Sequence, residues 1–373
     1  MRILALEPYH GGSHKAFLDG WIAHSQHAWT VLGLPAYKWK WRMRHAAITF
    51  AEQVAERVAA GERWDALFCS DMLNLAEFLG LAPTAVRSLP TVAYFHENQL
   101  TYPVRQESER DWHFAFTNLT TALAATQVWF NSAFHRDAWL GAMAAFLPRM
   151  PDCQPTDAVD RIRRKAIVYP PGVAAFEPRG PRNPGPMRIL WAARWEHDKD
   201  PDTFFAALNI LRHCGVDFRI SVVGEQFREQ PPIFEQARHE LSDRIDRWGF
   251  QPTRKAYEEA LGEADIIIST ARHEFFGISV VEAIAAGAWP LLPRRLAYPE
   301  ILSAAGASET DRFFYAGDAD ALADRLAELA GRIEAGTLWD DDPTWGARTV
   351  ARFTWPVLGP RLDGAIAELC KRT

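Results

Sequence analysis

A chain of 373 residues exceeds what one hydrophobic core usually organises, so we expect two domains of roughly 150 to 200 residues each. Hydrophobic residues at 48% and charged residues at 24% are the proportions of a soluble globular protein, and no apolar run is long enough to span a membrane. The net charge of −6 excludes a surface that attracts nucleic acid throughout, so any such binding must depend on a local cluster of cations.

Short apolar runs alternate with longer segments of helical period through the first half of the chain. This alternation is typical of βαβ units that build a parallel sheet. Helices are predicted at 46–60 and 111–125, among others. The predicted strands of this half are Arg2–Leu6, Ala66–Cys69, Thr91–Phe95, Val128–Asn131 and Ala166–Tyr169.

A second series of the same kind follows a segment, 170–186, that holds six prolines and three glycines. Such a composition cannot form a regular element, and it predicts a hinge at 176–186 between domains 1–175 and 187–354. The final segment, 355–373, is helical in period and is expected to pack back on the first domain. The predicted strands of the second series are Arg188–Ala193, Phe218–Val223, Asp246–Gly249, Ile266–Thr270 and Trp289–Leu292.

A glycine-rich segment follows the first predicted strand. His10, Gly11, Gly12 and His14 lie in it, and a helix that starts there would offer backbone N–H groups to a phosphate or to the acceptor of a reaction. His10 and His14 have the spacing of metal ligands, but we see no nearby acidic or cysteine partner for them. The sequence therefore predicts no metal site.

Another polar segment, His96, Glu97 and Asn98, follows the predicted strand 91–95. Its place at a strand end predicts that it lines a ligand site. His96 is either a hydrogen-bond partner of the acceptor or a structural histidine bonded to a backbone carbonyl. The sequence leaves both interpretations open.

Aromatic or apolar residues alternate with cations at 37–44. If this segment were extended, Lys38, Lys40 and Arg42 would lie on one side and Trp39 and Trp41 on the other. Cations can follow RNA phosphates while aromatic rings stack on unpaired bases. The alternative is a segment at the domain rim whose tryptophans are buried and whose charges are merely solvated.

Two cations five residues apart, Arg194 and Lys199, follow the predicted strand 188–193. They can converge on a diphosphate, arginine through its planar fork and lysine as a point charge, although a surface charge cluster has the same appearance. Gly224 and Glu225 end the strand 218–223, where backbone can approach a ligand. That signal is weak because glycines end many strands.

The most specific signal is a pair of glutamates, Glu274 and Glu282, around a turn that follows the predicted strand 266–270. The turn, Phe275–Phe276–Gly277, opens a helix at Ile278 whose free N–H groups form an anion site. Glu282 lies about two turns along this helix and can accept hydrogen bonds from a ribose. The spacing alone would suit a solvated helix face, but strand, turn and helix together favour a ligand site.

The positions in the second domain resemble those of the family-4 retaining glycosyltransferases. This resemblance implies that Arg194 and Lys199 bind the diphosphate of a sugar nucleotide, that Glu274 contacts the transferred hexose and that Glu282 contacts the ribose. The segment 249–252, with Phe250, would contact the base. His96, Arg194, Lys199 and Glu274 are then expected to take part in catalysis.

A closer resemblance spans nearly the whole chain. It rests on Tyr9–His14, Lys38–Arg42, Tyr94–Pro103, Arg194–Pro201 and His273–Gly277, which are similar to blocks of the tRNA-queuosine mannosyltransferases. It implies the α/β GT-B fold, two Rossmann-like domains facing a central cleft. It also implies mannose transfer from GDP-mannose to the cyclopentene-diol of queuosine at the wobble position of an aspartate tRNA. Alternatives are another sugar nucleotide with a saccharide or lipid acceptor, and a catalytically silent tRNA-binding relative.

No acidic residue in the first-domain motifs is an evident nucleophile, so the expected mechanism is same-face internal return. Two cations and a helix start would stabilise the departing diphosphate, and no metal or other cofactor is expected. Four scattered cysteines without a Cys-x-x-Cys pair indicate neither a disulfide framework nor a zinc site. A reducing cytoplasm fits best, with no membrane partner.

Overall fold

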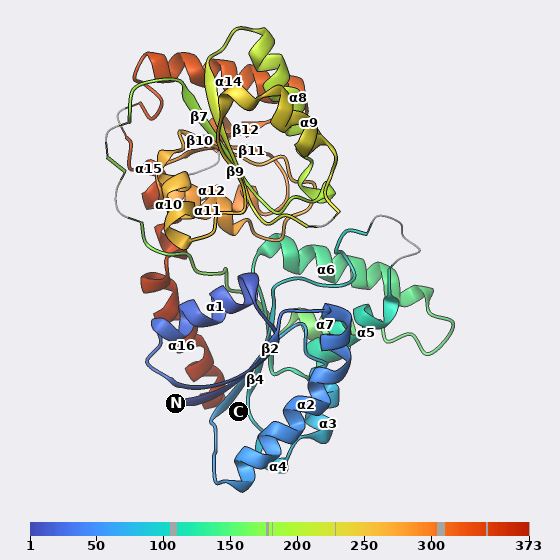
Figure 1. The fold of residues 1–373 in the computed structure, drawn as a ribbon. Coiled ribbons are helices and arrows are strands. Elements are labelled where there is room, and N and C mark those ends of the chain that lie inside the picture. The colour runs from blue at the N-terminus through green and yellow to red at the C-terminus, as the bar shows by residue number, and fades with distance from the viewer. Residues whose placement is uncertain are drawn as a thin grey trace. The chain divides into compact units, whose positions relative to one another are not determined.

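The computed structural model describes residues 1–104, 110–176, 179–180, 182–227, 229–303, 310–340 and 342–372 (Figure 1). Contacts divide the chain into two compact units. Unit 1 is formed by Met1–Gly172 together with Trp355–Thr373, and unit 2 by Val173–Thr354. The predicted last segment is therefore grouped with the first unit, and the predicted hinge lies inside the second.

Unit 1 is built on a six-stranded sheet in the order β2-β1-β3-β4-β5-β6, with every pair parallel. Alternate residues of β1 are buried on opposite faces, since Leu4 and Leu6 belong to one core cluster and Ile3 and Ala5 to another. The strands are β1 (Arg2–His10), β2 (Ala28–Pro35), β3 (Ala66–Ser70), β4 (Thr91–Phe95), β5 (Gln127–Phe130) and β6 (Ala166–Val168).

The sequence interpretation missed β2 and ended β1 four residues early. β2 lies at the edge of the sheet, is mostly only partly buried and contains a glycine, so it lacks the apolar run of the central strands. The helices of unit 1 are α1 (Gly12–Ala23), α2 (Trp39–Ala59), α3 (Leu75–Leu81), α4 (Thr84–Arg87), α5 (Trp112–Ala124), α6 (Ala133–Phe146), η2 (Leu147–Arg149), α7 (Ala158–Arg163) and α16 (Trp355–Arg372).

The alternating segment 37–44 is not extended, contrary to the expectation, because α2 begins at Trp39. Lys38 precedes the helix with a φ of 48°, which turns the chain into it. Met43 and Ala47, four residues apart, are buried, so the apolar spacing that counts here is that of a helix. The alternation of tryptophans at 39 and 41 with cations suggested a strand. In the helix these two tryptophans lie on different faces, and only Trp39 packs inward.

Helix α16, far along the chain, lies beside α1 in unit 1 (Figure 1). Its Asp363 is buried and accepts hydrogen bonds from Trp21 Nε1 at 2.8 Å, Ser25 Oγ at 2.7 Å and the Gln26 backbone N–H at 2.7 Å. Trp355, at the start of the same helix, packs on Phe17 with ring centroids 5.7 Å apart. The end of the chain thus completes the core of unit 1.

Asp363→Ala is expected to lower the unfolding free energy by about 2–4 kcal/mol, because it leaves the buried Trp21 indole N–H without an acceptor. Urea unfolding followed by tryptophan fluorescence measures this. Glu368→Ala is the matched control on the same helix, since the ion pairs of Glu368 with Lys371 and Arg372 are exposed, and it should change stability by less than about 0.5 kcal/mol. Equal effects of the two substitutions would contradict the anchoring role of Asp363.

Unit 2 is built on a second six-stranded parallel sheet in the order β12-β11-β10-β7-β8-β9. The strands are β7 (Met187–Ala192), β8 (Phe218–Val223), β9 (Ile245–Gly249), β10 (Ile266–Ile268), β11 (Trp289–Pro293) and β12 (Phe314–Tyr315). β12 was not predicted, because two residues are too few for a periodic signal. The two parallel α/β sheets confirm the predicted fold class.

The helices of unit 2 connect these parallel strands. They are η3 (His197–Lys199), α8 (Pro201–His213), α9 (Ile233–Glu240), η4 (Ser242–Arg244), α10 (Arg254–Glu263), α11 (Ile278–Ala285), α12 (Tyr298–Leu302), η6 (Asp311–Phe313), α14 (Ala319–Glu334), α15 (Trp345–Val350) and η7 (Ala351–Phe353). In the part of the chain that the structure describes, none of the helices has the length and apolarity that crossing a membrane requires.

Two arginines of the predicted hinge are bound to unit 2. Arg179 and Arg182 each donate at 2.9 Å to the carboxylate of Asp265, which is fully buried and also accepts from the Arg188 backbone N–H. Residues 177, 178 and 181 of the predicted hinge lie outside the described residues. In its described part, this segment is therefore hydrogen-bonded to unit 2 near the residue where β7 begins.

Candidate functional site

The order of the unit 2 sheet places a switch point between β7 and β10. From β7 the chain moves outward to β8 and β9, and from β10 it moves the other way to β11 and β12. Ligands of doubly wound sheets bind outside the carboxyl ends of the strands at such a point. Lys199 follows β7 and Glu274 follows β10, so the switch point brings these two predicted residues together.

Lys199 is a buried cation at the centre of this group. Its Nζ donates to the His273 carbonyl at 2.7 Å and forms ion pairs with Asp198 at 3.0 Å and Glu274 at 3.3 Å. Burial alone would lower the pKa of Lys199. The Glu274 and Asp198 carboxylates raise the pKa by more than burial lowers it, so the net shift is upward. The ammonium group therefore stays charged at the position where the sequence predicts a diphosphate site.

Arg194, directly after β7, is also held by an acidic neighbour. Its guanidinium forms an ion pair with Glu196 at 3.1 Å and remains partly exposed. The Glu274 carboxylate divides its two oxygens, accepting from Lys199 through Oε2 and from the Phe275 backbone N–H through Oε1 at 3.1 Å. Glu274 is thus held in one orientation by a contact at each of its oxygens.

The start of α11 has the geometry expected of an anion site. Gly277 precedes the helix with a φ of 101°, and a Cβ there would lie 3.1 Å from the ring of Tyr298. Ser279 is bound through Oγ to the Ala192 carbonyl at 2.6 Å, which ties the helix start to the end of β7. A narrow cavity in this place is lined by residues that include Lys199, Glu274 and Tyr298.

Glu282 is less open than the sequence interpretation assumed. It is buried, and its carboxylate accepts from Tyr257 Oη at 2.9 Å and pairs with Arg254 at 2.9 Å. Both partners lie on α10, three residues apart and therefore on one helix face. Sequence reasoning missed these residues, and their spacing of three, typical of one helix face, is the signal that could have found them.

The glycine that follows β8 is required by a close backbone contact. Gly224 has a φ of 152°, and a Cβ there would lie 1.8 Å from the carbonyl oxygen of Ala193. Gly249, which ends β9, has a φ of 86°. The backbone at the ends of β7 and β8 is therefore packed too tightly for any side chain at Gly224. The next residue, Glu225, accepts a hydrogen bond at its backbone carbonyl from the Trp195 backbone N–H, at 3.0 Å.

The remaining residues of the predicted donor site divide into exposed and buried ones. Phe250 is exposed, as a residue that stacks on a nucleotide base has to be. Phe275 and Phe276 are buried, and Phe276 packs in the core of unit 2 against Phe353 at 5.3 Å. Ile278 is partly buried against the same core. Phe276 thus anchors the turn at 275–277 to the core of unit 2.

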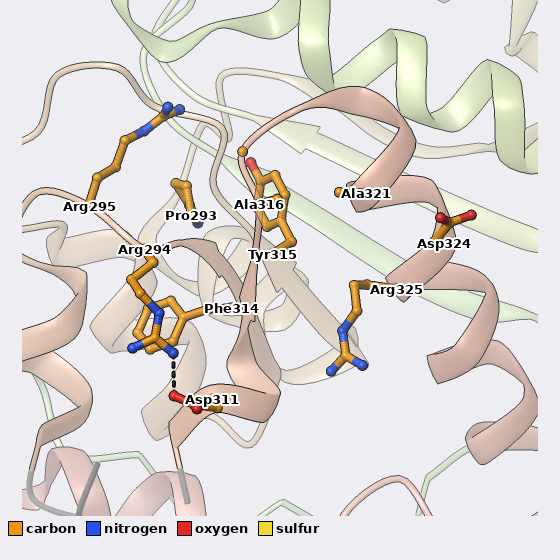
Figure 2. A pocket seen from close by; sticks show the side chains of 11 residues that line it. Pro293, Arg294, Arg295, Asp311, Phe314, Tyr315, Ala316, Ala321, Asp324 and Arg325 are labelled. Carbon is orange, nitrogen blue, oxygen red and sulfur yellow. Dashed lines mark hydrogen bonds and ion pairs between the residues drawn. The ribbon is translucent and has the colours of Figure 1, made fainter. Parts of the chain in front are cut away.

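A second cavity, of about 560 Å³, opens at the carboxyl ends of β11 and β12 (Figure 2). In it Arg294 pairs with Asp311 and lies over the Phe314 ring at 4.5 Å. Arg295 binds the Thr270 and Ala271 carbonyls, which follow β10, and thereby braces the segment that leads to Glu274. None of the residues predicted from the sequence lines this cavity.

In unit 1, the segment after β1 lies as predicted at a helix start. His10 ends β1, Gly11 caps α1, and Gly12 and His14 lie in its first turn. Gly11 is packed against Ala36, so close that a Cβ would lie 2.4 Å from the Ala36 side chain. Only a glycine fits at this position.

His14 is buried and has an acidic partner after all. Its Nδ1 lies 3.2 Å from Oε1 of Glu7, a residue of β1 that also accepts from the Ser70 hydroxyl at 2.9 Å. Burial lowers the pKa of His14, but Glu7 and, more weakly, Asp71 and Glu97 raise it to about 9. The sequence interpretation found no partner because β1 was expected to end before its alternation put Glu7 beside the helix.

The His96 ring packs against the His14 ring at an interplanar angle of 31°, with ring centroids 4.0 Å apart. Its backbone N–H donates to Asp71 at 2.9 Å, and its carbonyl accepts from Asn131 at 2.8 Å. Burial, with His14 and His135 nearby, holds the pKa of His96 well below its usual range, and burial raises the pKa of Asp71 to about 8. His96 is thus a neutral imidazole in a rigid setting.

The two residues after His96 differ in their surroundings. Asn98 is fully buried and shapes the turn, accepting from the Leu100 and Thr101 backbone N–H groups and donating to His135 at 3.0 Å. Glu97 is partly buried and accepts from Gln99 at 3.1 Å. Asn98 therefore maintains the loop, and Glu97 is the more accessible of the two.

Three side chains of metal-ligating type meet in this part of unit 1. The ligand atoms of Glu7, His14 and His96 all lie within 4.8 Å of one another. Glu7 is 1% exposed and His14 is 6% exposed. The reason given from sequence for excluding a metal here, the lack of an acidic partner, was therefore wrong.

The cationic segment around the start of α2 forms a basic-aromatic surface, which we define as Tyr37, Lys38, Lys40, Trp41 and Arg44. All five side chains are exposed. Tyr37 and Trp41 are each 61% exposed, although large aromatic side chains are usually buried. Lys38 and Lys40 lie over the Tyr37 and Trp39 rings at 5.3 and 5.5 Å, while Trp39 itself packs on Phe114.

Comparisons with known proteins agree with this arrangement. Residues 2–173 match the family model tRNA-queuosine alpha-mannosyltransferase N-terminal, and residues 175–331 match glycosyl transferases group 1. The chain is 36% identical over 311 residues to the tRNA-queuosine alpha-mannosyltransferase of Drosophila melanogaster, covering 80% of this chain and 81% of that protein. It is 23% identical over 254 residues to GDP-mannose:cellobiosyl-diphosphopolyprenol alpha-mannosyltransferase of Xanthomonas oryzae pv. oryzae, covering 67% and 65%.

Solved structures share the fold. Sucrose-phosphate synthase from Thermosynechococcus elongatus aligns over 100% of both chains with a TM-score of 0.73 at 14% identity. Anabaena HepE, solved with UDP, aligns over 100% of both chains with a TM-score of 0.67 at 15% identity. The fold is thus the GT-B architecture, and with 36% identity over most of its length to the Drosophila protein the chain belongs to the tRNA-queuosine alpha-mannosyltransferase family.

Proposed function

We propose that this protein transfers mannose from GDP-mannose to the cyclopentene-diol of queuosine in tRNA, with retention at the anomeric carbon. The main support in the structure is the meeting of Lys199 and Glu274 at the switch point of unit 2, beside a glycine-led helix start. Family membership supplies the acceptor class. The Xanthomonas relative has GDP-mannose in its name and supports the donor.

The donor would bind along the carboxyl edge of the unit 2 sheet. Arg194, Lys199 and the backbone N–H groups after Gly277 would hold the diphosphate, and Glu274 would accept from the mannose hydroxyls. Glu282 would meet the ribose, with Tyr257 fixing its carboxylate. Phe250, exposed after β9, would cover the base, with Gly224 allowing the backbone to approach.

The reaction we propose is same-face internal return. The bond between the anomeric carbon and the β-phosphate oxygen breaks first, leaving an oxocarbenium-like sugar beside the departing GDP. The queuosine hydroxyl then attacks from the same face, and its proton passes to that phosphate oxygen. The protein mainly stabilises the negative charge that develops on the diphosphate.

We propose that no divalent metal is required at the diphosphate. Lys199 is charged, buried and already fixed by Asp198 and Glu274, so its charge is preorganised rather than recruited from solution. Arg194 adds a second positive charge from the end of β7. Two cations and a helix start supply the neutralisation that a metal ion provides in other transferases.

The acceptor would bind unit 1. His10, Gly11, Gly12 and His14 lie at the start of α1, and His96 and Glu97 follow β4, so both groups border the carboxyl end of the unit 1 sheet. The basic-aromatic surface on α2 supplies Lys38, Lys40 and Arg44 for phosphates and Trp41 for stacking. Since the whole chain carries a net charge of −6, such a local patch is what RNA binding requires.

Trp41→Ala is expected to weaken tRNA binding by roughly 5- to 150-fold, the loss of about 1–3 kcal/mol from one stacked base. Filter binding at several salt concentrations measures it, and the slope against salt should stay unchanged because no charge is removed. Leu81→Ala is the control, since Leu81 is a large apolar side chain of unit 1 that is 53% exposed and lies on α3. Equal losses in the two variants would mean that the surface is not specific.

The decisive experiment supplies radiolabelled GDP-mannose with bulk tRNA that contains or lacks queuosine. We expect label in the queuosine-containing tRNA alone. Label in saccharides or lipids would instead favour a different acceptor, and tRNA binding without donor turnover would identify a catalytically silent relative. Substituting UDP-glucose for GDP-mannose tests the donor, and purified aspartate tRNA tests which tRNA is used.

We place the reaction in the cytoplasm. Cys69, Cys153, Cys214 and Cys370 are all free thiols, as a reducing compartment permits. Fractionation of cells that express the protein with an epitope tag tests this assignment.

A further inference from the structure

Glu7, His14 and His96 come from three separate elements and converge at one place in unit 1. Glu7 lies in β1, His14 in the first turn of α1, and His96 directly after β4. Their ligand atoms lie within 4.8 Å of one another, and the Glu7 and His14 atoms are 3.2 Å apart. Ligands that each lie roughly 2 Å from one metal ion are roughly 3–4 Å apart, and the separation of the Glu7 and His14 atoms matches this.

Among the residues that the structure describes, two buried polar atoms around this group have no hydrogen-bond partner. They are Nε2 of His96 and Oδ2 of Asp71, and Asp71 is fully buried. Leaving such atoms unpaired costs free energy, so buried polar atoms are normally bonded to protein, to water or to an ion. The orphaned His96 nitrogen is of the type that ligates metals.

The charges of the group point the same way. The carboxylates of Glu7, Asp71 and Glu97 all interact electrostatically with the one imidazole of His14. Two of the three, Glu7 and Asp71, are at most 1% exposed, so water screens them little. Because water screens the Glu7 carboxylate little, this carboxylate would attract a positive ion bound beside it.

We propose that Glu7, His14 and His96 bind a divalent transition-metal ion, with Zn²⁺ as the expected metal. Two imidazoles and one carboxylate suit zinc, whereas Mg²⁺ and Ca²⁺ prefer oxygen ligands alone. Asp71, which accepts the His96 backbone N–H at 2.9 Å, would be an outer carboxylate that holds His96 in place. The site belongs to unit 1 and does not depend on the proposed function.

Such an ion would join β1, α1 and the loop after β4 at the carboxyl edge of the sheet. A metal on Nε2 of His96 would also fix the tautomer of the ring, leaving Nδ1–H as a donor. If the proposed function is correct, His96 would then reach the acceptor as a positioned N–H group. The proposed role of the ion is therefore structural, and it involves no contact with the diphosphate of the donor.

The first experiment measures metal in the full-length wild-type protein. We expect stoichiometric Zn²⁺ by elemental analysis of protein purified without chelator, and saturable Zn²⁺ binding by calorimetry after chelator treatment. Mg²⁺ should give no such binding. Co²⁺ added to the metal-free protein should produce the visible absorption of a protein-ligated ion. A wild-type protein that neither carries nor binds Zn²⁺ or Co²⁺ would overturn the proposal, whether or not it transfers mannose.

Variants then test the ligand set. Glu7→Gln and His96→Gln should each weaken Zn²⁺ binding by more than the roughly 10- to 100-fold that loss of an outer partner costs, and Asp71→Asn by about that amount. His10→Gln is the matched control, because His10 lies in the same segment but outside the three-residue set. Unchanged Zn²⁺ affinity in Glu7→Gln, or an equal loss in His10→Gln, would show that these residues are not the ligands. Circular dichroism checks that each variant is folded.

Discussion

Lys199→Ala is expected to lower the rate of mannose transfer by roughly 10²- to 10³-fold, about 3–4 kcal/mol of transition-state stabilisation. The loss should appear in kcat as well as in kcat/KM, because the charge on the diphosphate develops as the glycosidic bond breaks. Lys199 is 6% exposed and touches Glu274, so no water-exposed cation can replace it without rearrangement. Steady-state transfer of labelled mannose to tRNA measures the effect.

Arg272→Ala is the matched control for this substitution. Arg272 is a cation of the segment that leads to Glu274, but it is largely exposed and its guanidinium binds Asp200. Its removal should leave transfer within a few-fold of wild type. Near-normal turnover of Lys199→Ala would remove Lys199 from the proposed role.

Stability has to be measured beside activity, because Lys199→Ala also leaves Asp198 and Glu274 without their shared partner. We expect a lower unfolding temperature, since a buried charge without its partner is destabilising. Rates are therefore compared well below that temperature. Lys199→Arg, which keeps the charge, should recover part of the stability but little of the activity, because a planar fork does not fit the contacts of an ammonium group.

Gly224→Ala is expected to reduce the unfolding free energy by about 2–6 kcal/mol and to abolish binding of GDP-mannose. The added Cβ would lie 1.8 Å from the Ala193 carbonyl oxygen, and alanine disfavours a φ of 152°. Overpacking and backbone strain each cost about 1–3 kcal/mol. The backbone must move at Ala193, one residue before Arg194, so the proposed diphosphate site should change together with the stability.

Urea unfolding and calorimetry with GDP-mannose check both parts of this expectation. Gly262→Ala is the control, because Gly262 is an exposed glycine of α10 with open space around its Cβ position. That substitution should leave donor binding intact and stabilise the protein by about 0.5–1 kcal/mol. A Gly224→Ala protein with wild-type stability and donor affinity would refute the tight packing at this strand end.

Much of the fold and of the donor site follows from local sequence. Central strands such as 91–95 and 218–223 are apolar throughout because both faces of a parallel sheet are covered, and their ends were predicted to the residue. Lys199 and Glu274 each follow such a strand. Their meeting is then a consequence of sheet order, which parallel strands and short connections largely determine.

Other features depend on contacts that no local pattern contains. Glu7 meets His14 because β1 continues beyond its apolar part, and polar residues at a strand end carry no periodic signal. Glu282 is bound by Arg254 and Tyr257 from another helix, a pairing that requires the packing of α10 on α11. The helix at Trp39 replaced a strand-like alternation because burial of Met43 and Ala47 outweighs the pattern of two tryptophans.

The position of α16 has a consequence for synthesis of the protein. Phe17 and Trp21 belong to a core that is incomplete until residues 355–372 of α16 have been synthesised. All of unit 2 is translated between the two parts of unit 1. At about 5–20 residues per second, the nascent first unit would wait on the order of ten seconds or more with aromatic surface uncovered. Unit 1 is therefore a natural client for chaperones on the ribosome, and a premature stop codon anywhere in unit 2 would leave both halves incomplete.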